Sequence, residues 1–323
     1  MKAYLPNAAF LQNLGPFLNR LDLSQPEKLE ILSHPRWAFV HPVVLSMIAS
    51  LGLTVRPENI TTNIEARSRH YFERMGLFKT LGIESGIQIQ EHESSGRFVP
   101  ISVVRVEDEL DRAIKNIVPM LHLSGYPEQA KTLMYIIYEI ARNVIEHAES
   151  KYGGVICAQY YPDKNKIRVG IADYGLGIRT TIKRSHHAET HLEAIGLALR
   201  PGITGTTNKP TGTAQNAGAG LFFTKSIARI NEDYFWIYSG DTAYKLLPKQ
   251  KERMTIPADP FIDRHSVSTG LPYWKGTAVG IDITLDQTVQ FQLLLDYLGK
   301  ILDEAVRERK RERKLPFKEP RFI

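Results

Sequence analysis

Features that would narrow the function at once are scarce in this chain. Its 323 residues include one cysteine, Cys157, so no internal disulfide can form, and a reducing compartment fits. The first residues, Met-Lys-Ala-Tyr-Leu-Pro-Asn, lack the long apolar region of a signal peptide. The longest apolar run, residues 37–53, is interrupted by His41 and Pro42 and is short for a bilayer span. We therefore expect a cytoplasmic protein without a membrane segment.

Two further observations concern nucleotides and nucleic acids. No Gly-x-x-x-x-Gly-Lys-Ser/Thr loop occurs, which argues against P-loop chemistry. The net charge of +6 is modest, and much of the excess lies in residues 307–314, Arg-Glu-Arg-Lys-Arg-Glu-Arg-Lys. The glutamates in this segment and its place near a terminus favour a solvated helix end over a nucleic-acid or anionic-membrane patch. Nucleic acid is therefore not an expected partner.

The length allows two domains, each with its own core, and we expect an α/β (α+β) chain. Glu93-Ser-Ser-Gly96 is the best candidate linker. The domains expected from it are a small α/β domain (1–95), a larger α/β domain (98–287), and a C-terminal helix with a basic tail (288–323). In the first, the pattern predicts a short strand at 38–40, a helix from Pro42 to Gly52, a helix from Asn63 to Met75, and a strand at 86–90.

In the larger domain, the pattern predicts helices at 106–123, 127–150 and 220–230, strands at 154–161, 166–172, 234–239 and 277–285, a final helix at 291–306, and an irregular tail at 314–323. Pro162-Asp-Lys-Asn165 is typical of a hairpin turn. Residues 178–215 are poor in strand signal and rich in Gly and Thr around 202–213. A connection of this length is usually functional or disordered.

The helix expected at 127–150 carries three polar residues on one face. Glu139, Asn143 and His147 follow each other at i, i+4 spacing, so their side chains project on the same side. A carboxylate, an amide and an imidazole in a row can hold a metal-bound anion and activate a hydroxyl. Beside them runs an apolar stripe of Leu133, Ile136, Ile137, Ile140 and Val144.

A second motif, Asp173-Tyr-Gly175-Leu-Gly177, places a carboxylate at the end of a hydrophobic strand. The two glycines after it let a ligand approach the backbone. Two glycine segments follow: residues 216–221, Asn-Ala-Gly-Ala-Gly-Leu, at the start of a helix, and Gly276-Thr277 before a strand. Each motif alone has an ordinary structural explanation as a surface residue, a turn or a helix start. Taken together, however, the first two motifs predict a nucleotide site of a kind other than the P-loop.

Over residues 106–285, these four motifs resemble the GHKL ATPase superfamily, and within it the anti-sigma-factor serine-kinase branch. The resemblance implies a Bergerat-type α/β sandwich that binds ATP with Mg²⁺. It also implies roles on the long helix. Glu139 matches the catalytic glutamate that polarises the attacking water or hydroxyl, which suits a general base. Asn143 matches the Mg²⁺ ligand, and His147 matches a position that supports the phosphates or the helix packing.

The other matched residues surround the nucleotide. Asp173 matches the aspartate that accepts a hydrogen bond from the adenine amino group, and Thr277 matches a threonine near adenine. Five residues match the two glycine motifs: Gly175 and Gly177 in the turn, and Gly218, Gly220 and Leu221 at the helix start, where N–H groups favour phosphate.

The resemblance makes residues 178–215 an ATP lid that orders over bound nucleotide, and a disordered loop without a gating role is the alternative. Within this stretch, His187-Ala-Glu-Thr-His191 has histidines at i, i+4 that could hold zinc. No clear third and fourth ligand accompanies them, so a solvated helix face is the better interpretation.

Residues 39–45 and 71–78 of the first domain resemble a STAS-type, anti-anti-sigma-like domain. In phosphorylatable members of that family a serine stands where the helix opens. This chain has His41-Pro42 there, and the first serine of the helix is Ser46. A small α/β domain used only for docking is therefore at least as well supported as a phosphorylation switch within the chain.

The expected function is an Mg²⁺-ATP-dependent serine/threonine protein kinase of anti-sigma-factor type. Its expected partner is a regulatory protein, with STAS-type proteins among the candidates, and a homodimer stays open. Two alternatives remain: a nucleotide-gated protein-binding switch with little or no turnover, and an ATPase that drives a conformational cycle.

Overall fold

The computed structural model describes residues 1–87, 98–121, 123–203, 205, 219–248, 256–285 and 291–314. The chain is mixed α/β, which confirms the expected fold class. The expected linker at 93–96 and most of the strand expected at 86–90 lie outside the described residues. Among the described residues, no helix combines the length and apolar character needed to cross a membrane.

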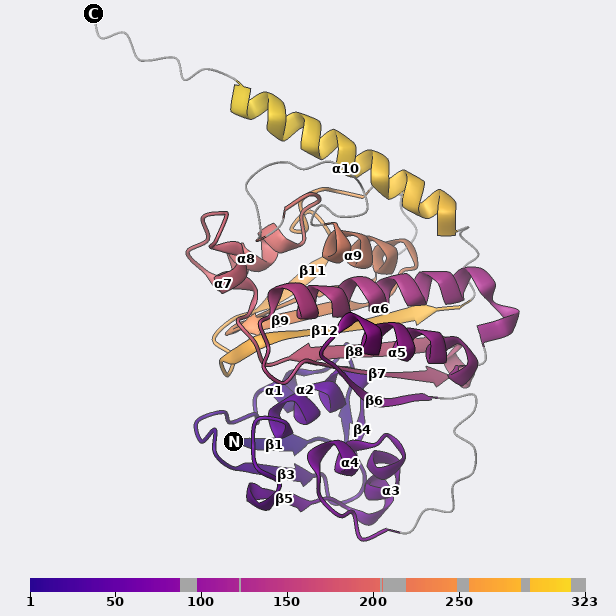
Figure 1. Ribbon diagram of the computed structural model, residues 1–323, viewed down its shortest axis with the longest axis vertical. Helices are drawn as coiled ribbons and strands as arrows, with labels where there is room; N and C mark the ends of the chain where they lie inside the picture. The colour runs from indigo at the N-terminus through magenta and orange to yellow at the C-terminus, as the bar shows by residue number, and fades with distance from the viewer. Residues whose placement is uncertain are drawn as a thin grey trace, which may run out of the picture.

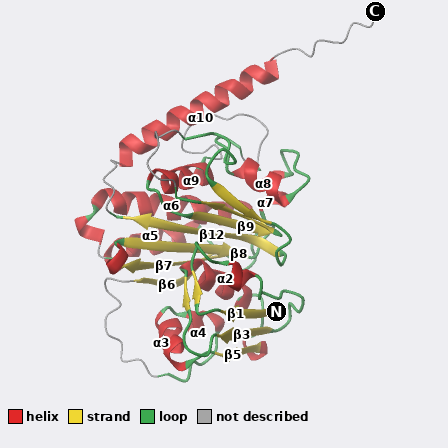
Figure 2. Ribbon diagram, turned by 180° about the vertical axis from the view of Figure 1, so that it is seen from behind, coloured by secondary structure: helices red, strands yellow, loops and turns green. Residues whose placement is uncertain are grey.

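A seven-stranded antiparallel sheet forms the middle of the molecule (Figures 1 and 2). Its order across the sheet is β11-β10-β9-β12-β8-β7-β6. The strands are β6 (Phe98–Val104), β7 (Gly154–Tyr161), β8 (Lys166–Asp173), β9 (Phe235–Gly240), β10 (Thr242–Leu246), β11 (His265–Ser268) and β12 (Trp274–Thr284). The central strands β8 and β12 pair along their whole shared length, so Asp173 and Thr277 are carried by neighbouring strands.

One face of this sheet is covered by helices α5 (Glu107–Met120), α6 (Pro127–His147) and α9 (Gly220–Ile230) (Figure 1). The apolar stripe predicted on α6 is buried against the sheet, and α9 has its predicted bounds. Two short helices, α7 (Ile178–Ile182) and α8 (His191–Ala198), pack near β9 and β10. Helix α10 (Phe291–Lys314) lies across the outside, at the far end from the N-terminal unit.

The N-terminal unit has a parallel sheet in the order β1-β3-β5, from β1 (Lys2–Leu5), β3 (Leu29–Ser33) and β5 (Ile60–Asn63), and a short pair of β2 (Ala8–Ala9) and β4 (Phe39–Val40). Its helices are α1 (Gly15–Leu18), α2 (Pro42–Gly52), α3 (Ala66–Arg74) and α4 (Leu77–Leu81). The predicted helix bounds at Pro42 and Gly52 are confirmed.

Helix α2 joins the two units, because all eleven of its residues are buried. It lies against the opposite face of the large sheet, on β7, β8 and β12. Two glycines that face each other in register, Gly170 and Gly280, let it approach this closely. A methyl group at Gly170 would collide with the backbone of Pro42 and Val43. The two predicted domains therefore pack as one body with a shared core.

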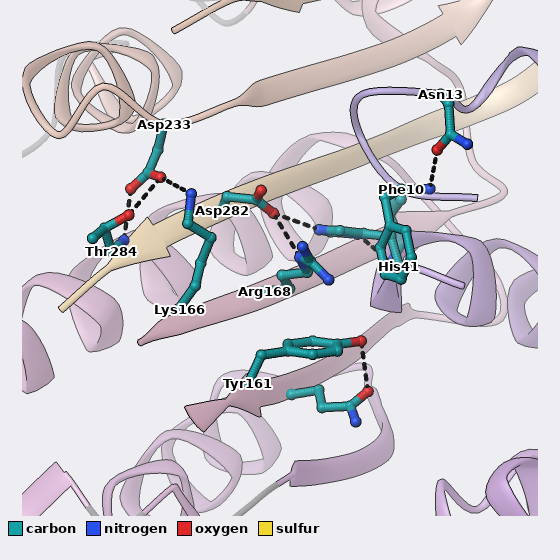
Figure 3. Close-up of polar contacts among 11 residues, drawn as sticks. Phe10, Asn13, His41, Tyr161, Lys166, Arg168, Asp233, Asp282 and Thr284 are labelled. Carbon is teal, nitrogen blue, oxygen red and sulfur yellow. Dashed lines mark hydrogen bonds and ion pairs between the residues drawn. The ribbon is translucent and has the colours of Figure 1, made fainter. Parts of the chain in front are cut away.

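A buried polar cluster closes this junction (Figure 3). His41 caps α2 through Nδ1, which accepts the Val43 N–H at 3.1 Å, and its Nε2 lies 3.2 Å from the Asp282 carboxylate. Burial lowers the pKa of His41, although Asp282 opposes the shift, so the ring is held neutral. The Arg168 guanidinium pairs with Asp282 and is 4.3 Å from the ring centroids of both Phe10 and Tyr161.

Ser46 lies inside the same junction. Its hydroxyl is fully buried and donates to the Gly170 carbonyl at 2.9 Å. A kinase cannot reach this hydroxyl unless α2 leaves the sheet. The helix therefore serves as a packing element.

Several boundaries differ from the predictions. The helix expected from Asn63 begins at Ala66, because Ile60–Asn63 pairs with β3 and the Glu65 carboxylate caps α3 by accepting the N–H groups of Arg67 and Ser68. The final helix continues beyond residue 306 to Lys314, so the basic stretch 307–314 is the helix end that the sequence favoured. Strand β9 is one residue later than predicted, and β12 begins three residues earlier.

Candidate nucleotide pocket

An open pocket of about 790 Å³, a volume that includes its mouth, lies between α6, α7 and the ends of β8 and β12. Its lining draws on all four predicted motifs, which are far apart in the sequence. The predicted residues that line it are Asn143, His147, Asp173, Gly177, Gly220, Leu221 and Thr277. Glu139 and Gly175 stand just behind this lining, and Gly218 lies outside the described residues.

Helix α6 supplies the polar wall. Asn143 and His147 line the pocket, and Glu139 is one turn earlier, against the start of α9. A methyl group at Gly220 would come within 2.5 Å of a Glu139 carboxylate oxygen, so this glycine lets α9 begin beside the carboxylate. Burial raises the pKa of Glu139, and Glu146 adds to the shift while Arg142 opposes it. A carboxylate with a raised pKa suits proton abstraction near neutral pH.

Asp173 forms the floor of the pocket and is 1% exposed. Its Oδ1 accepts the Gly175 N–H at 2.8 Å, and its Oδ2 accepts the Thr277 N–H at 3.3 Å. Burial raises the pKa of Asp173 to about 7, although both N–H groups lower it. Each carboxylate oxygen keeps a second lone pair, so the group can accept a further hydrogen bond from a ligand.

This buried carboxyl group makes stability depend on pH. Its folded-state pKa of about 7 lies above its ordinary 3.8, so the folded chain binds the extra proton between these values and stability falls as pH rises through them. From about pH 5.5 to about pH 8, Asp173 should lower the free energy of unfolding by about 2 kcal/mol. Urea unfolding of the wild type and Asp173→Asn at both pH values isolates this contribution, because Glu139 and Asp233 titrate in both proteins. Parallel pH profiles would contradict the burial argument.

The turn after β8 is shaped by its glycines. A methyl group at Gly175 would collide with the carbonyl oxygen of Ala148, which accepts the Leu176 N–H at 2.8 Å, so the turn rests on the end of α6. Gly177 has φ +77°, in the left-handed region that favours glycine. Gly175 therefore acts through packing, whereas Gly177 also lines the pocket.

The remaining walls are apolar and suit a flat ring. They are formed by side chains of Ile140, Val144, Ile171, Ile178, Ile182, Ala198, Ile203 and Val279. Four of these belong to the stretch that the sequence suggested as a lid. The i, i+4 spacing of Ile178 and Ile182 is the signal that could have identified α7 as a pocket wall. Residues 204 and 206–218 lie outside the described part of the chain.

Helix α9 is held in place by a buried ion cluster. Lys225 and Arg229 both donate to the Asp263 carboxylate, and Lys225 and Asp263 are fully buried. Burial lowers the pKa of Lys225, against the attraction of Asp263. This cluster fixes α9 and thus the position of Gly220 at the mouth of the pocket.

The two histidines considered as zinc ligands are not on one helix. Helix α8 begins at His191 with Thr190 as its cap, so His187 precedes it, and the His187 side chain is 83% exposed. In the described ranges, no group of three or more His, Cys, Asp or Glu side chains could hold a metal ion. His187 is solvated as expected, but the prediction that it lies on a helix face is wrong.

No family model, no curated protein and no solved structure matches the chain.

Proposed function

We propose that the pocket binds ATP with Mg²⁺ in the manner of GHKL ATPases and that the chain transfers the γ-phosphate to a serine or threonine of a regulatory partner protein. One observation carries the proposal. Four segments spread over about half of the chain meet around one buried carboxylate in a pocket whose other walls are largely apolar. A flat ring with an amino group satisfies both the apolar walls and the acceptor at the floor.

Adenine is a flat ring with an amino group, so it suits this pocket. Its amino group would donate to Asp173, and its faces would lie between the isoleucines of α6 and α7. The ionised form of Asp173 is the acceptor, so binding should weaken below the pKa of about 7.

The phosphates would lie toward Gly220, where the N-terminus of the eleven-residue helix α9 offers N–H groups and a favourable dipole. Asn143 would provide an oxygen ligand to Mg²⁺. One protein ligand is sufficient because Mg²⁺ takes most of its oxygens from phosphate and water. Glu139 would accept the proton of the attacking hydroxyl. The hydroxyl oxygen would form a bond to the γ-phosphorus as the bond from that phosphorus to ADP breaks.

Substitution of Glu139 by glutamine tests the chemistry. Glu139→Gln should lower ADP production from Mg²⁺-ATP at least about 100-fold and leave ATP affinity within about threefold, because the amide cannot take the proton. Glu128→Gln is the matched control on the same helix, since Glu128 pairs with Lys131 and lies about three turns from Glu139. Turnover that is equal in all three proteins would rule out Glu139 as the base.

The acceptor is tested separately with γ-labelled ATP and candidate partner proteins. Label on a partner serine that disappears with Glu139→Gln supports the kinase. ATP binding without turnover or labelling would instead support the nucleotide-gated switch, whose binding residues are the same.

A further inference from the structure

Ser239 is a buried residue of β9 that belongs to none of the four motifs. It is 1% exposed, and its register partner on β12 is Thr277, which lines the pocket. Its hydroxyl accepts the Ile178 N–H at 2.9 Å and donates to the Gly276 carbonyl at 2.8 Å. One oxygen thus joins the two chain segments that enclose Asp173.

The hydrogen bond from the Ile178 N–H to Ser239 takes the place of a side-chain cap at the N-terminus of α7. Helix α7 begins at Ile178, and its N-cap position is Gly177, which has no side chain to cap it. A larger residue does not fit there, because a methyl group would lie 2.7 Å from the Lys275 carbonyl oxygen and 3.0 Å from the Ser239 oxygen. The cap usually provided by a serine or threonine at this position therefore comes from a neighbouring strand.

The second hydrogen bond holds an irregular part of β12. The pairing of β12 with β9 shifts between Trp274 and Thr277, and Ser239 is the register partner of Thr277. Within this irregularity, Gly276 passes so close to Asp173 that a methyl group would collide with its carboxylate. Holding the Gly276 carbonyl keeps the next N–H, that of Thr277, directed at Asp173 Oδ2.

We propose that Ser239 is a positioning residue for the adenine ring: its hydroxyl sets the distance between the α7 wall and the β12 segment that presents Thr277. This inference rests on the proposed nucleotide function. Without the hydroxyl, the Ile178 N–H loses its buried acceptor, and α7 and Gly276 are no longer tied to the same point. The α7 wall of the pocket then moves relative to Asp173 at the pocket floor.

The test compares Ser239→Ala with two other variants by titration calorimetry at about pH 8, with ATP and with adenosine as separate ligands. Ser239→Ala should bind both ligands about tenfold more weakly, because the change affects only the part of the pocket proposed to hold the adenine ring. Ser239→Cys, whose thiol is a weak donor and acceptor, should lose less affinity than the alanine variant. Ser226→Ala is the matched control, since the Ser226 hydroxyl is equally buried, on α9, and has no hydrogen-bond partner among the residues that the structure describes.

Three outcomes would overturn the inference: unchanged affinity in Ser239→Ala, an equal loss in Ser226→Ala, or a loss for ATP with none for adenosine. Should the alanine variant not fold, the cysteine variant carries the same comparison. A wild-type chain that binds neither ligand would refute the proposed function itself. Wild-type binding together with unchanged affinity in Ser239→Ala would refute only the proposed role of Ser239.

Discussion

Asp173→Asn is expected to lower the affinity for ATP at about pH 8 by about 100-fold or more. The carboxylate is the acceptor at the floor of the pocket, and an amide has a single oxygen for the ligand and for two N–H groups. Its NH₂ group would face either the Gly175 N–H or the Thr277 N–H. The loss of a buried charge-assisted hydrogen bond, together with one donor left without an acceptor, accounts for about 3 kcal/mol.

The measurement is a calorimetric titration of each protein with ATP. Asp241→Asn is the matched control, because Asp241 is in the turn after β9, does not line the pocket, and pairs with the Thr242 hydroxyl. It should bind as the wild type does. A folded Asp173→Asn that keeps wild-type affinity would remove Asp173 from the site.

Gly170→Ala is expected to destabilise the chain by at least about 3 kcal/mol, if it folds at all. The added methyl group would meet the backbone at Pro42 and Val43, which cannot rotate away as a side chain can. Helix α2 would have to leave β8, which exposes its buried residues and separates His41 from Asp282. Urea unfolding measures the loss.

Gly299→Ala provides the control for this prediction. Gly299 is in α10, and no atom of the described part of the chain lies within 4 Å of the added methyl group, so the same substitution should stabilise the chain by about 0.5–1 kcal/mol. Equal stability of Gly170→Ala and the wild type would show that α2 is not packed on the sheet.

The parts of the fold that local signals specify were predictable. Pro42 and Gly52 bound α2 as expected, and the apolar stripe of α6 is buried where the periodicity placed it. Strand β6 was not predicted. Pro100 interrupts it, and a proline is compatible with a strand only at an edge or a bulge. Among the described strands β6 stands at the edge of its sheet, and its register shifts between Val99 and Ser102.

Several residues that line the pocket were predictable, but their arrangement was not. The motifs include Asp173 and the α6 face because each is a local pattern. The roles of Ser239 and of α7 depend on contacts between residues 37 and 61 positions apart, which no local pattern contains. Similarly, the sequence showed only that His41 stands where phosphorylatable STAS-type domains have a serine. In the fold, His41 is a buried helix cap that pairs with Asp282.

A crystal structure of the full chain with Mg²⁺ and a non-hydrolysable ATP analogue would show whether the pocket around Asp173 holds the nucleotide. The adenine ring should lie between the apolar walls with its amino group on Asp173, the triphosphate at Gly220 and the metal ion on Asn143. Nucleotide density at any other place on the molecule, with this pocket empty at a saturating concentration of the analogue, would contradict it.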